Sequence, residues 1–167
     1  LYEDARAFLE VTGEMLYAKE TVNNLMLGVN EQLISDPQAY ENPFFATVID
    51  DEGTLQLAAV MTPPHNIILA GGDDFDVGLP VLISYLQTAK IPVPGVIGPV
   101  HIAERFVSAW KKLRRQNHTI NMRQRVYELR HVRMPPLPPG HFRIAGPKDI
   151  EKISDWLEAY EDEALGK

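Results

Sequence analysis

Apolar residues recur at helical spacing over the first 35 residues of the chain. The pattern predicts a helix from Asp4 to Val11, which Gly13 interrupts, and a second helix from Glu14. Asp36 ends the second helix, because the residue before a proline is disfavoured in the helical region. We expect its apolar stripe to face the core; the stripe consists of Val22, Leu25, Met26, Val29 and Leu33.

The pattern then changes to one that is typical of strands. Phe44–Ile49 and Leu55–Met61 are joined by a turn at Asp50–Gly53, which predicts an antiparallel hairpin. Ile67–Ala70 is short and entirely apolar, as strands covered on both faces usually are. The three strands are therefore expected to form a meander.

Helices and a short strand alternate in the next stretch. The loop Gly71–Asp76 opens a helix that runs to about Thr88, and Val96–Gly98 is expected to be a short buried strand. Pro99 suits the first position of the following helix, where its missing N–H costs nothing. The inner stripe of that helix is Ala103, Phe106, Val107, Trp110 and Leu113.

From Ile120 to Val132, apolar and basic residues alternate, which predicts one long strand or two shorter ones. Prolines then exclude regular structure, because they remove backbone donors and fix φ. Beyond them, Phe142–Ala145 is expected to be a strand and Pro147–Ala164 a helix with an apolar face.

This order of elements predicts an α/β fold, with a mixed, mostly antiparallel central sheet and helices on both faces. We expect a first domain over residues 1–133 and a proline-rich linker over residues 134–141. Residues 142–167 are expected to supply only the first strand and first helix of a second domain.

The composition of the chain excludes several kinds of functional site. The chain has 167 residues, 23 acidic and 16 basic, with a net charge of −7 and no cysteine. A disulfide framework, a thiolate nucleophile and a cysteine-based zinc site are excluded. No apolar run approaches the ~20 residues that span a bilayer, and the amino end does not resemble a signal peptide. We therefore expect a cytoplasmic protein that does not engage a membrane.

The charge is unevenly distributed. Residues 1–53 carry eleven acids and two bases, whereas residues 103–133 carry nine bases and two acids. We expect the basic strand over residues 123–133 to present its arginines on an outer face, where they pair with the acidic amino-terminal helices. The alternative is a non-enzymatic binding module that uses this strand for an acidic partner or RNA. Nucleic acid is disfavoured because few aromatics interleave with the bases and the whole chain is acidic.

No metal site or hydrolase motif stands out. The histidines lack the i, i+4 pairing of a helical metal site, and no serine lies in a G-x-S-x-G turn. Asp73, Asp74 and Asp76 lack the remaining ligands of a calcium loop, so we expect them to cap the next helix. Gly71-Gly72 before a helix suggests a phosphate cradle, but the three acids would repel phosphate.

Several strings, taken in order, resemble the GNAT superfamily of acetyl-CoA-dependent N-acetyltransferases, specifically its bacterial two-domain members. None is specific alone; the resemblance rests on their order across nearly the whole chain. The strings are Asn23–Gly28, Met61–Asn66, Gly95–Pro99 leading to Phe106 and Trp110, Tyr127–Leu129, and Phe142–Ala145 with Asp149 and Trp156.

The resemblance implies an enzyme that transfers an acetyl group from acetyl-CoA to an unidentified small-molecule or peptide amine. Residues 1–133 would be its degenerate amino-terminal copy, and residues 142–165 would begin the catalytic copy. The family holds the pyrophosphate of acetyl-CoA in an Arg/Gln-x-x-Gly-x-Gly/Ala loop between a central strand and a helix. This chain has Gly71–Asp76 there, so the resemblance assigns acetyl-CoA to a missing carboxyl-terminal domain beyond Lys167. It assigns no catalytic, cofactor-binding or metal-binding residue to this chain.

A chain that stops inside a second domain leaves its last strand and helix without their packing partners. We expect these elements to dock back on the first domain, to pair with another copy of the chain, or to fray. Self-association through this end is one of the expected outcomes.

Overall fold

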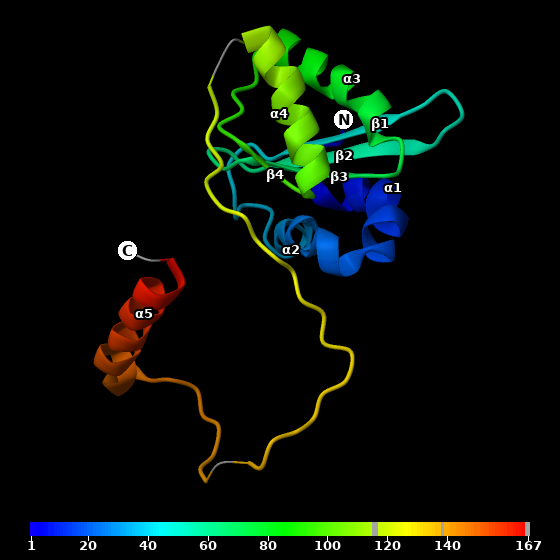
Figure 1. Ribbon diagram of the computed structural model, residues 1–167. Helices are drawn as coiled ribbons and strands as arrows, with labels where there is room; N and C mark the ends of the chain where they lie inside the picture. Colours follow the sequence, from blue (N-terminus) through cyan, green and yellow to red (C-terminus); the bar gives the residue numbers. More distant parts are fainter. Residues whose placement is uncertain (115–116, 138, 166–167) are drawn as a thin grey trace. The chain divides into compact units, whose positions relative to one another are not determined.

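The computed structural model describes residues 1–114, 117–137 and 139–165. The chain separates into two compact units, Leu1–Glu128 and Leu129–Lys167, shown in Figure 1. Regular structure is concentrated in the first unit.

A four-stranded sheet forms the centre of the first unit. Its strands are β1 (Phe44–Ile49), β2 (Leu55–Met61), β3 (Ile67–Gly71) and β4 (Val96–Ile97), and they lie side by side in that order. The first three strands pair antiparallel, whereas β4 runs parallel to β3. The predicted hairpin, the predicted meander and the mixed, mostly antiparallel sheet are confirmed.

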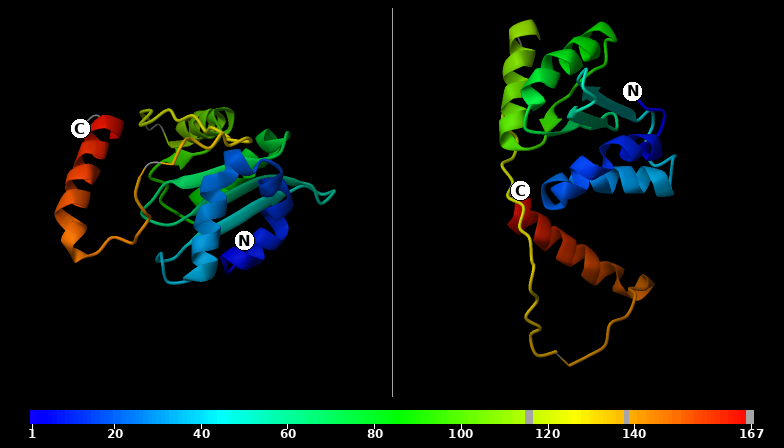
Figure 2. Two further views of the ribbon diagram at one scale, coloured as in Figure 1. Left: turned by 90° about the horizontal axis from the view of Figure 1, so that it is seen from below. Right: turned by 90° about the vertical axis from the view of Figure 1, so that its right-hand side faces the viewer.

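Helices cover both faces of the sheet, as predicted. α1 (Ala5–Ala18) and α2 (Glu20–Ser35) pack on one face, and α3 (Phe75–Thr88) and α4 (Val100–Arg114) pack on the other (Figure 2). Because both faces are covered, every residue of β2 except the first is buried.

Each face has its own hydrophobic core. On the α1/α2 side, the ring of Phe8 packs against that of Phe45, with centroids 5.6 Å apart. On the α3/α4 side, the largest fully buried side chains are Leu57, Met61, Ile67, Leu69, Ile83, Leu86 and Ile102. The alternation of strand side chains divides the apolar residues between these two cores.

The first helix was predicted to end before Gly13, but α1 continues through this glycine to Ala18. Its buried residues Phe8, Thr12 and Leu16 form one stripe that extends past the glycine. Asp4 starts the helix by accepting a 2.8 Å hydrogen bond from the Ala7 N–H. The stripe therefore outweighs the ~1 kcal/mol that a helical glycine costs relative to alanine, and the second helix begins at Glu20 rather than Glu14.

The predicted inner stripe of α2 is only half right. Met26 and Leu33 are buried, whereas Val22 and Leu25 are exposed. Two asparagines occupy the inner face, because local hydrogen bonds make their burial tolerable. The Asn23 amide donates to the Leu16 carbonyl at 3.0 Å, and the Asn30 amide donates to the Met26 carbonyl at 2.7 Å.

The predicted helix over residues 75–88 is confirmed as α3. The strand predicted at Val96–Gly98 exists as β4, but it lies at the edge of the sheet and is not buried, with Ile97 39% exposed. Pro99 directly precedes α4, and its carbonyl accepts from the N–H groups of Ile102 and Ala103. Of the predicted α4 stripe, Phe106 is buried and Leu113 is exposed.

The strand predicted over Ile120–Val132 is wrong for this structure. Residues 117–130 have no regular structure and are exposed throughout. The alternation of apolar and basic residues indicates which side chains would share a face of a strand. A strand also needs a neighbouring strand to form hydrogen bonds with its backbone N–H and C=O groups. No strand of the described chain pairs with this segment.

The second unit contains a single-turn 3-10 helix, Pro147–Asp149, which leads into α5 (Ile150–Leu165), so the predicted helix is confirmed. The strand predicted over Phe142–Ala145 is not formed, because this segment pairs with no strand of the described residues. Instead, the Arg143 guanidinium donates two 2.6 Å hydrogen bonds to the Asp149 carboxylate. These bonds lower the pKa of Asp149 to about 2. The described residues of the 134–141 linker are irregular, as predicted; residue 138 lies outside the described part.

Two helical glycines provide a matched test of the packing. An ideal Cβ on Gly28 meets no atom within 4 Å, whereas one on Gly78 lies 3.2–3.3 Å from the Cβ atoms of Gln56, Leu57 and Val48. Gly28→Ala is expected to raise the free energy of unfolding by about 0.5–1 kcal/mol. Gly78→Ala is expected to lower it, because the strand backbone holds those three Cβ atoms in place. Urea denaturation of both variants measures the difference, and a stabilised Gly78→Ala variant would contradict the close packing of α3 on the sheet.

Candidate functional site

The carboxyl ends of β3 and β4 lie at the same edge of the sheet, because these two strands are parallel. Gly71 ends β3 and Gly98 follows β4; α3 and α4 begin immediately beyond. In open α/β sheets, ligands bind outside the carboxyl ends of parallel strands, next to helix amino termini. This edge is therefore the candidate site, and the sequence-predicted loop Gly71–Asp76 lies in it.

The glycines at this edge serve the protein's own packing. A Cβ on Gly71 would lie 2.6 Å from the Phe75 Cβ, and a Cβ on Gly98 would lie 2.6 Å from the Leu69 carbonyl oxygen. Phe75 is only 8% exposed. The space that a glycine turn would otherwise leave for a ligand is thus filled by the chain itself.

The first turn of α3 is tied to α4 by a two-point ion pair. The Arg105 guanidinium donates from Nε and from one terminal nitrogen to the two oxygens of Asp76, both at 2.9 Å. These hydrogen bonds lower the pKa of Asp76 and raise that of Arg105. His101 lies beside them, with its ring edge-on to Phe75 at a centroid distance of 5.2 Å. The basic side chain best placed to hold an anion is therefore already bound to a carboxylate.

The remaining acids add negative charge to this edge. Asp74 occupies the position before α3, but its side chain makes no capping hydrogen bond, so this part of the predicted capping is wrong. The side chain of Asp73 is 99% exposed and lies 4.0 Å from the Lys19 Nζ. The turn that opens α3 thus carries acidic rather than basic side chains, and the residues present do not fit a pyrophosphate.

A polar network in the β1–β2 hairpin was not anticipated from the sequence. The Asp50 carboxylate accepts hydrogen bonds from the N–H groups of Thr54 and Glu52 and from the Gln56 side-chain amide. These bonds, the one from Thr54 foremost, lower the pKa of Asp50. Gln56 is 5% exposed, and its Oε1 has no hydrogen-bond partner. The signal in the sequence was a lone polar residue at the start of the apolar run Leu55–Met61.

The structure does not gather the other candidate residues into a site. The ring of His65 packs edge-on against that of Tyr40, at a centroid distance of 6.0 Å. His101 instead packs against Phe75. Within residues 1–114, 117–137 and 139–165, no three acidic or histidine side chains lie close enough to hold a metal ion. His118, His131 and His141 lie in the irregular segments.

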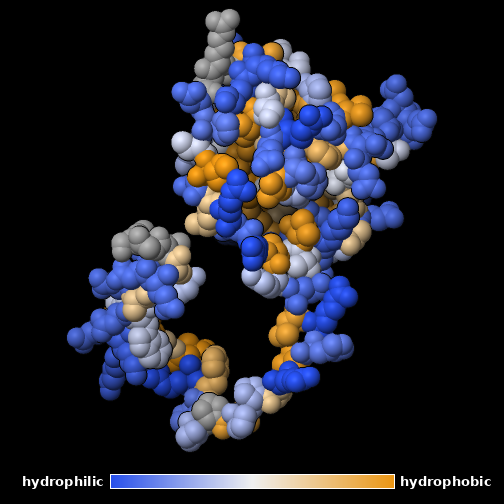
Figure 3. Space-filling view, viewed as in Figure 1, coloured by the Kyte–Doolittle hydropathy of each residue, from blue (hydrophilic) through white to orange (hydrophobic). Residues whose placement is uncertain are grey.

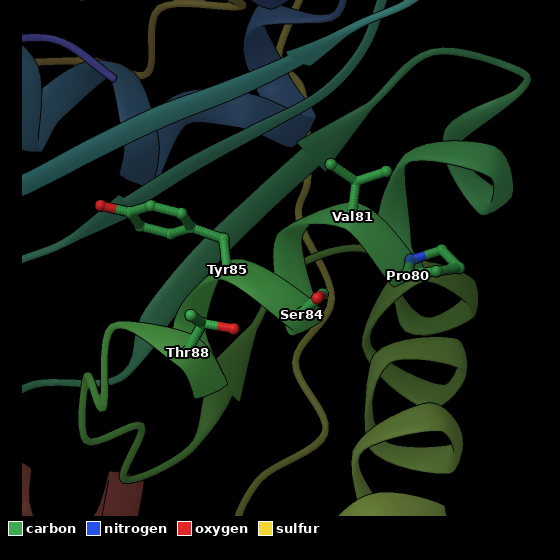
Figure 4. A pocket seen from close by; sticks show the side chains of 5 residues that line it. All are labelled: Pro80, Val81, Ser84, Tyr85 and Thr88. Carbon is green, nitrogen blue, oxygen red and sulfur yellow. The ribbon is translucent and has the colours of Figure 1, made fainter.

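A shallow hollow on the outer side of α3 also lacks catalytic groups. Figure 4 shows its five lining side chains, all of which come from this one helix: Pro80, Val81, Ser84, Tyr85 and Thr88. None is an acid, a histidine or a lysine that could activate the Ser84 hydroxyl. The hollow is an apolar surface with hydroxyl groups, not a hydrolase site.

The basic segment crosses the boundary between the two units, since the first unit ends at Glu128. Residues 117–133 are all exposed, including Arg123 and Arg125. The predicted arrangement, in which these arginines lie on the outer face of a half-buried strand beside the acidic helices, is not present. None of the described helices is long and apolar enough to cross a membrane.

Comparison with protein-family models, with curated proteins and with solved structures finds no match to this chain.

The Asp76–Arg105 pair has a testable electrostatic signature. Arg105→Gln is expected to raise the pKa of Asp76 toward 3.8, because the hydrogen bonds from Arg105 are the main cause of its lowered value. Since the folded-state pKa lies below the unfolded value, the pair stabilises the fold above that unfolded value. Its contribution is lost as the pH falls through the lowered pKa. Carbon-detected NMR titration of the Asp76 carboxyl, with melting temperatures measured across the same pH range, tests both statements.

Arg6→Gln is the matched control, because it removes the same charge from α1, on the other face of the sheet. The control should leave the Asp76 titration unchanged. An equal shift in both variants would show that overall charge, not the ion pair, sets the pKa of Asp76.

Proposed function

We propose that the first unit is the non-catalytic, amino-terminal half of an acetyl-CoA-dependent N-acetyltransferase. In this role it shapes the side of the enzyme that receives the acceptor amine and packs against the catalytic half. The observation that carries the proposal is the pairing order of the unit. Two helices precede an antiparallel meander, and then α3 returns the chain to a parallel strand followed by α4. This is the α/β unit that the resemblance to GNAT enzymes implies.

The β3–α3 turn supports a non-catalytic role for this half. The resemblance places the acetyl-CoA loop between a central strand and a helix, and Gly71–Asp74 is the turn at that point of the fold. Its backbone donors are accompanied by Asp73, Asp74 and Asp76, and its inner space is filled by Phe75. We therefore assign acetyl-CoA, which supplies the acetyl thioester, to residues outside this unit.

The exposed apolar face of α5, in the second unit, supports the presence of a catalytic half in the proposed enzyme. The apolar stripe of α5 is uncovered within its own unit, with Ile150 63%, Leu157 59% and Tyr160 64% exposed. An amphipathic helix is stabilised mainly by packing its apolar face against another layer. The catalytic half of the proposed enzyme would supply that layer.

Calorimetry with acetyl-CoA tests the proposal. Residues 1–167 should bind no acetyl-CoA, whereas a longer chain that includes the proposed catalytic half should bind it and acetylate an amine. Inorganic phosphate, titrated separately, measures any general affinity for anions. Tight binding of acetyl-CoA by residues 1–167 would contradict a non-catalytic first unit, and an extended chain that neither binds nor reacts would overturn the enzyme assignment.

A second candidate function follows from the exposure of residues 117–133. Four arginines lie in this segment, and Tyr127 is 82% exposed. Single-stranded RNA is bound by basic groups that contact phosphates and by aromatic rings on which bases stack, and both are present here. Binding that depends on phosphate contacts weakens steeply as salt rises.

Fluorescence anisotropy with a labelled single-stranded RNA at several salt concentrations tests this candidate. Replacing Arg123 and Arg125 with glutamine should lower the log–log salt slope by about 1.4, from ~0.7 per phosphate contact. Replacing Arg6 and Lys19 with glutamine removes the same charge elsewhere and should leave the slope unchanged. The absence of binding even at low salt would exclude this function.

A further inference from the structure

The outer face of α3 is apolar and exposed. None of residues 77–89 is charged, although the inner face of the helix is already packed on the sheet. A helix on a sheet normally presents charged residues to the solvent, whereas a helix that is apolar all round is typically covered on every side. The outer residues Val77, Val81 and Tyr85 are 67%, 58% and 40% exposed. Figure 3 shows that hydrophobic residues reach the surface of the first unit. The outer face of α3 therefore has the character of an interaction surface.

The outer residues have the spacing of a helix that pairs with another helix. Intervals of four, three and four residues place four side chains in one stripe along α3. These are Val77, Val81, Ser84 and Thr88. All four are small or β-branched, so a second helix can approach the stripe closely. Figure 4 shows the shallow hollow along this stripe, with the Tyr85 ring extending to one side of it.

The two ends of α3 carry opposite charges. Asp73 and Asp74 precede the helix and Asp76 lies in its first turn, whereas Lys90 follows its last residues. Asp74 and Lys90 are both exposed. Two copies of α3 that run antiparallel would place the acidic end of each helix beside the basic end of the other, with opposed helix dipoles. Charge complementarity thus favours a second copy of this chain as the occupant of the stripe.

α5 is less suited to the stripe. Its apolar residues alternate with acids, among them Glu151, Asp155 and Glu158. Removing water from these carboxylates is costly unless cations pair with them, and the stripe on α3 contains no cation. The same lack of basic residues makes the stripe unsuitable for a nucleic acid.

We propose that two copies of the chain form a dimer in which the outer faces of α3 pack antiparallel about a two-fold axis. An axis between residues 82 and 83 places Val81 of each copy beside Ser84 of the partner subunit, so that one stripe is complementary to itself. The same register brings Lys90 of each copy to the acidic end of the other helix. The proposal depends on α3 alone and not on the acetyltransferase function.

Light scattering of residues 1–167 over a range of concentrations tests the dimer. The mass is expected to rise from that of the 18.8 kDa chain to twice this value. Val81→Lys should weaken the dimer by at least about a hundredfold, because it would bury an unpaired ammonium group in each copy. Val22→Lys is the matched control on α2, since Val22 is 51% exposed on the other side of the sheet. This control and Leu157→Lys on α5 should leave the dimer unchanged, and circular dichroism should confirm that each variant is folded.

Disulfide cross-linking tests the register, because the chain contains no cysteine. At a rise of 1.5 Å per residue, the two Ser84 positions lie about 4.5 Å apart along the proposed helix pair and the two Thr88 positions about 16 Å apart. A disulfide needs Cα atoms within about 7 Å of each other. Ser84→Cys is therefore expected to cross-link on mild oxidation, whereas Thr88→Cys is not. Ser35→Cys, at the end of α2, is the control for random collisions.

A chain that stays monomeric at every concentration would overturn the proposal. A dimer that persists in Val81→Lys but is lost in Leu157→Lys would assign the self-association to α5 and contradict it as well. Equal cross-linking of Ser84→Cys and Thr88→Cys would exclude the antiparallel register.

Discussion

The parallel pairing of β3 with β4 is the constraint on which the rest of the structure depends. It consists of two residue pairs, Ile67 with Val96 and Ile68 with Ile97. Because the strands are parallel, the chain must cross over between them, and α3 makes that crossover on one face. The pairing also brings the turns after both strands to one edge and leaves β4 at the margin of the sheet. The fold, the candidate site and the open edge therefore have one origin.

Local periodicity was sufficient for the elements whose partners are close in sequence. The hairpin, the meander and α3 were all predicted, because adjacent segments supply their packing and hydrogen bonds. The failures have a physical cause beyond local pattern. The inner face of α2 was predicted to be apolar, but it includes Asn23 and Asn30. Their burial is possible because nearby carbonyls accept hydrogen bonds from their side-chain amides. Residues 120–132 alternate as a strand does, but alternation does not specify a neighbour, and the described structure contains none.

The candidate site shows the same division between what sequence can and cannot predict. The glycines and acids of Gly71–Asp76 could be located on a turn before a helix, and their charge could be assessed from the sequence. The ion pair between Asp76 and Arg105 could not, because it joins residues 29 apart whose approach depends on the packing of α3 beside α4. The role of Gln56 was equally hidden, since this residue lies where the register between β1 and β2 is irregular, between the pairs Val48–Leu57 and Ile49–Leu55. Long-range geometry, not residue type, decides the chemistry of this edge.

That geometry explains how a fold can keep the shape of a binding site without the means to bind there. Two helix amino termini converge beyond parallel strands, which is the arrangement that favours an anion. In this chain the Cβ of Phe75 occupies the space beside Gly71, and the carboxylate of Asp76 accepts the two hydrogen bonds from Arg105 that an anion would otherwise accept. The groups that would hold a ligand hold one another instead, so they stabilise the contact between α3 and α4. Among the described residues, the outer margin of β4 pairs with no strand and the apolar face of α5 is exposed, so these two surfaces are where further interactions of the chain are to be sought.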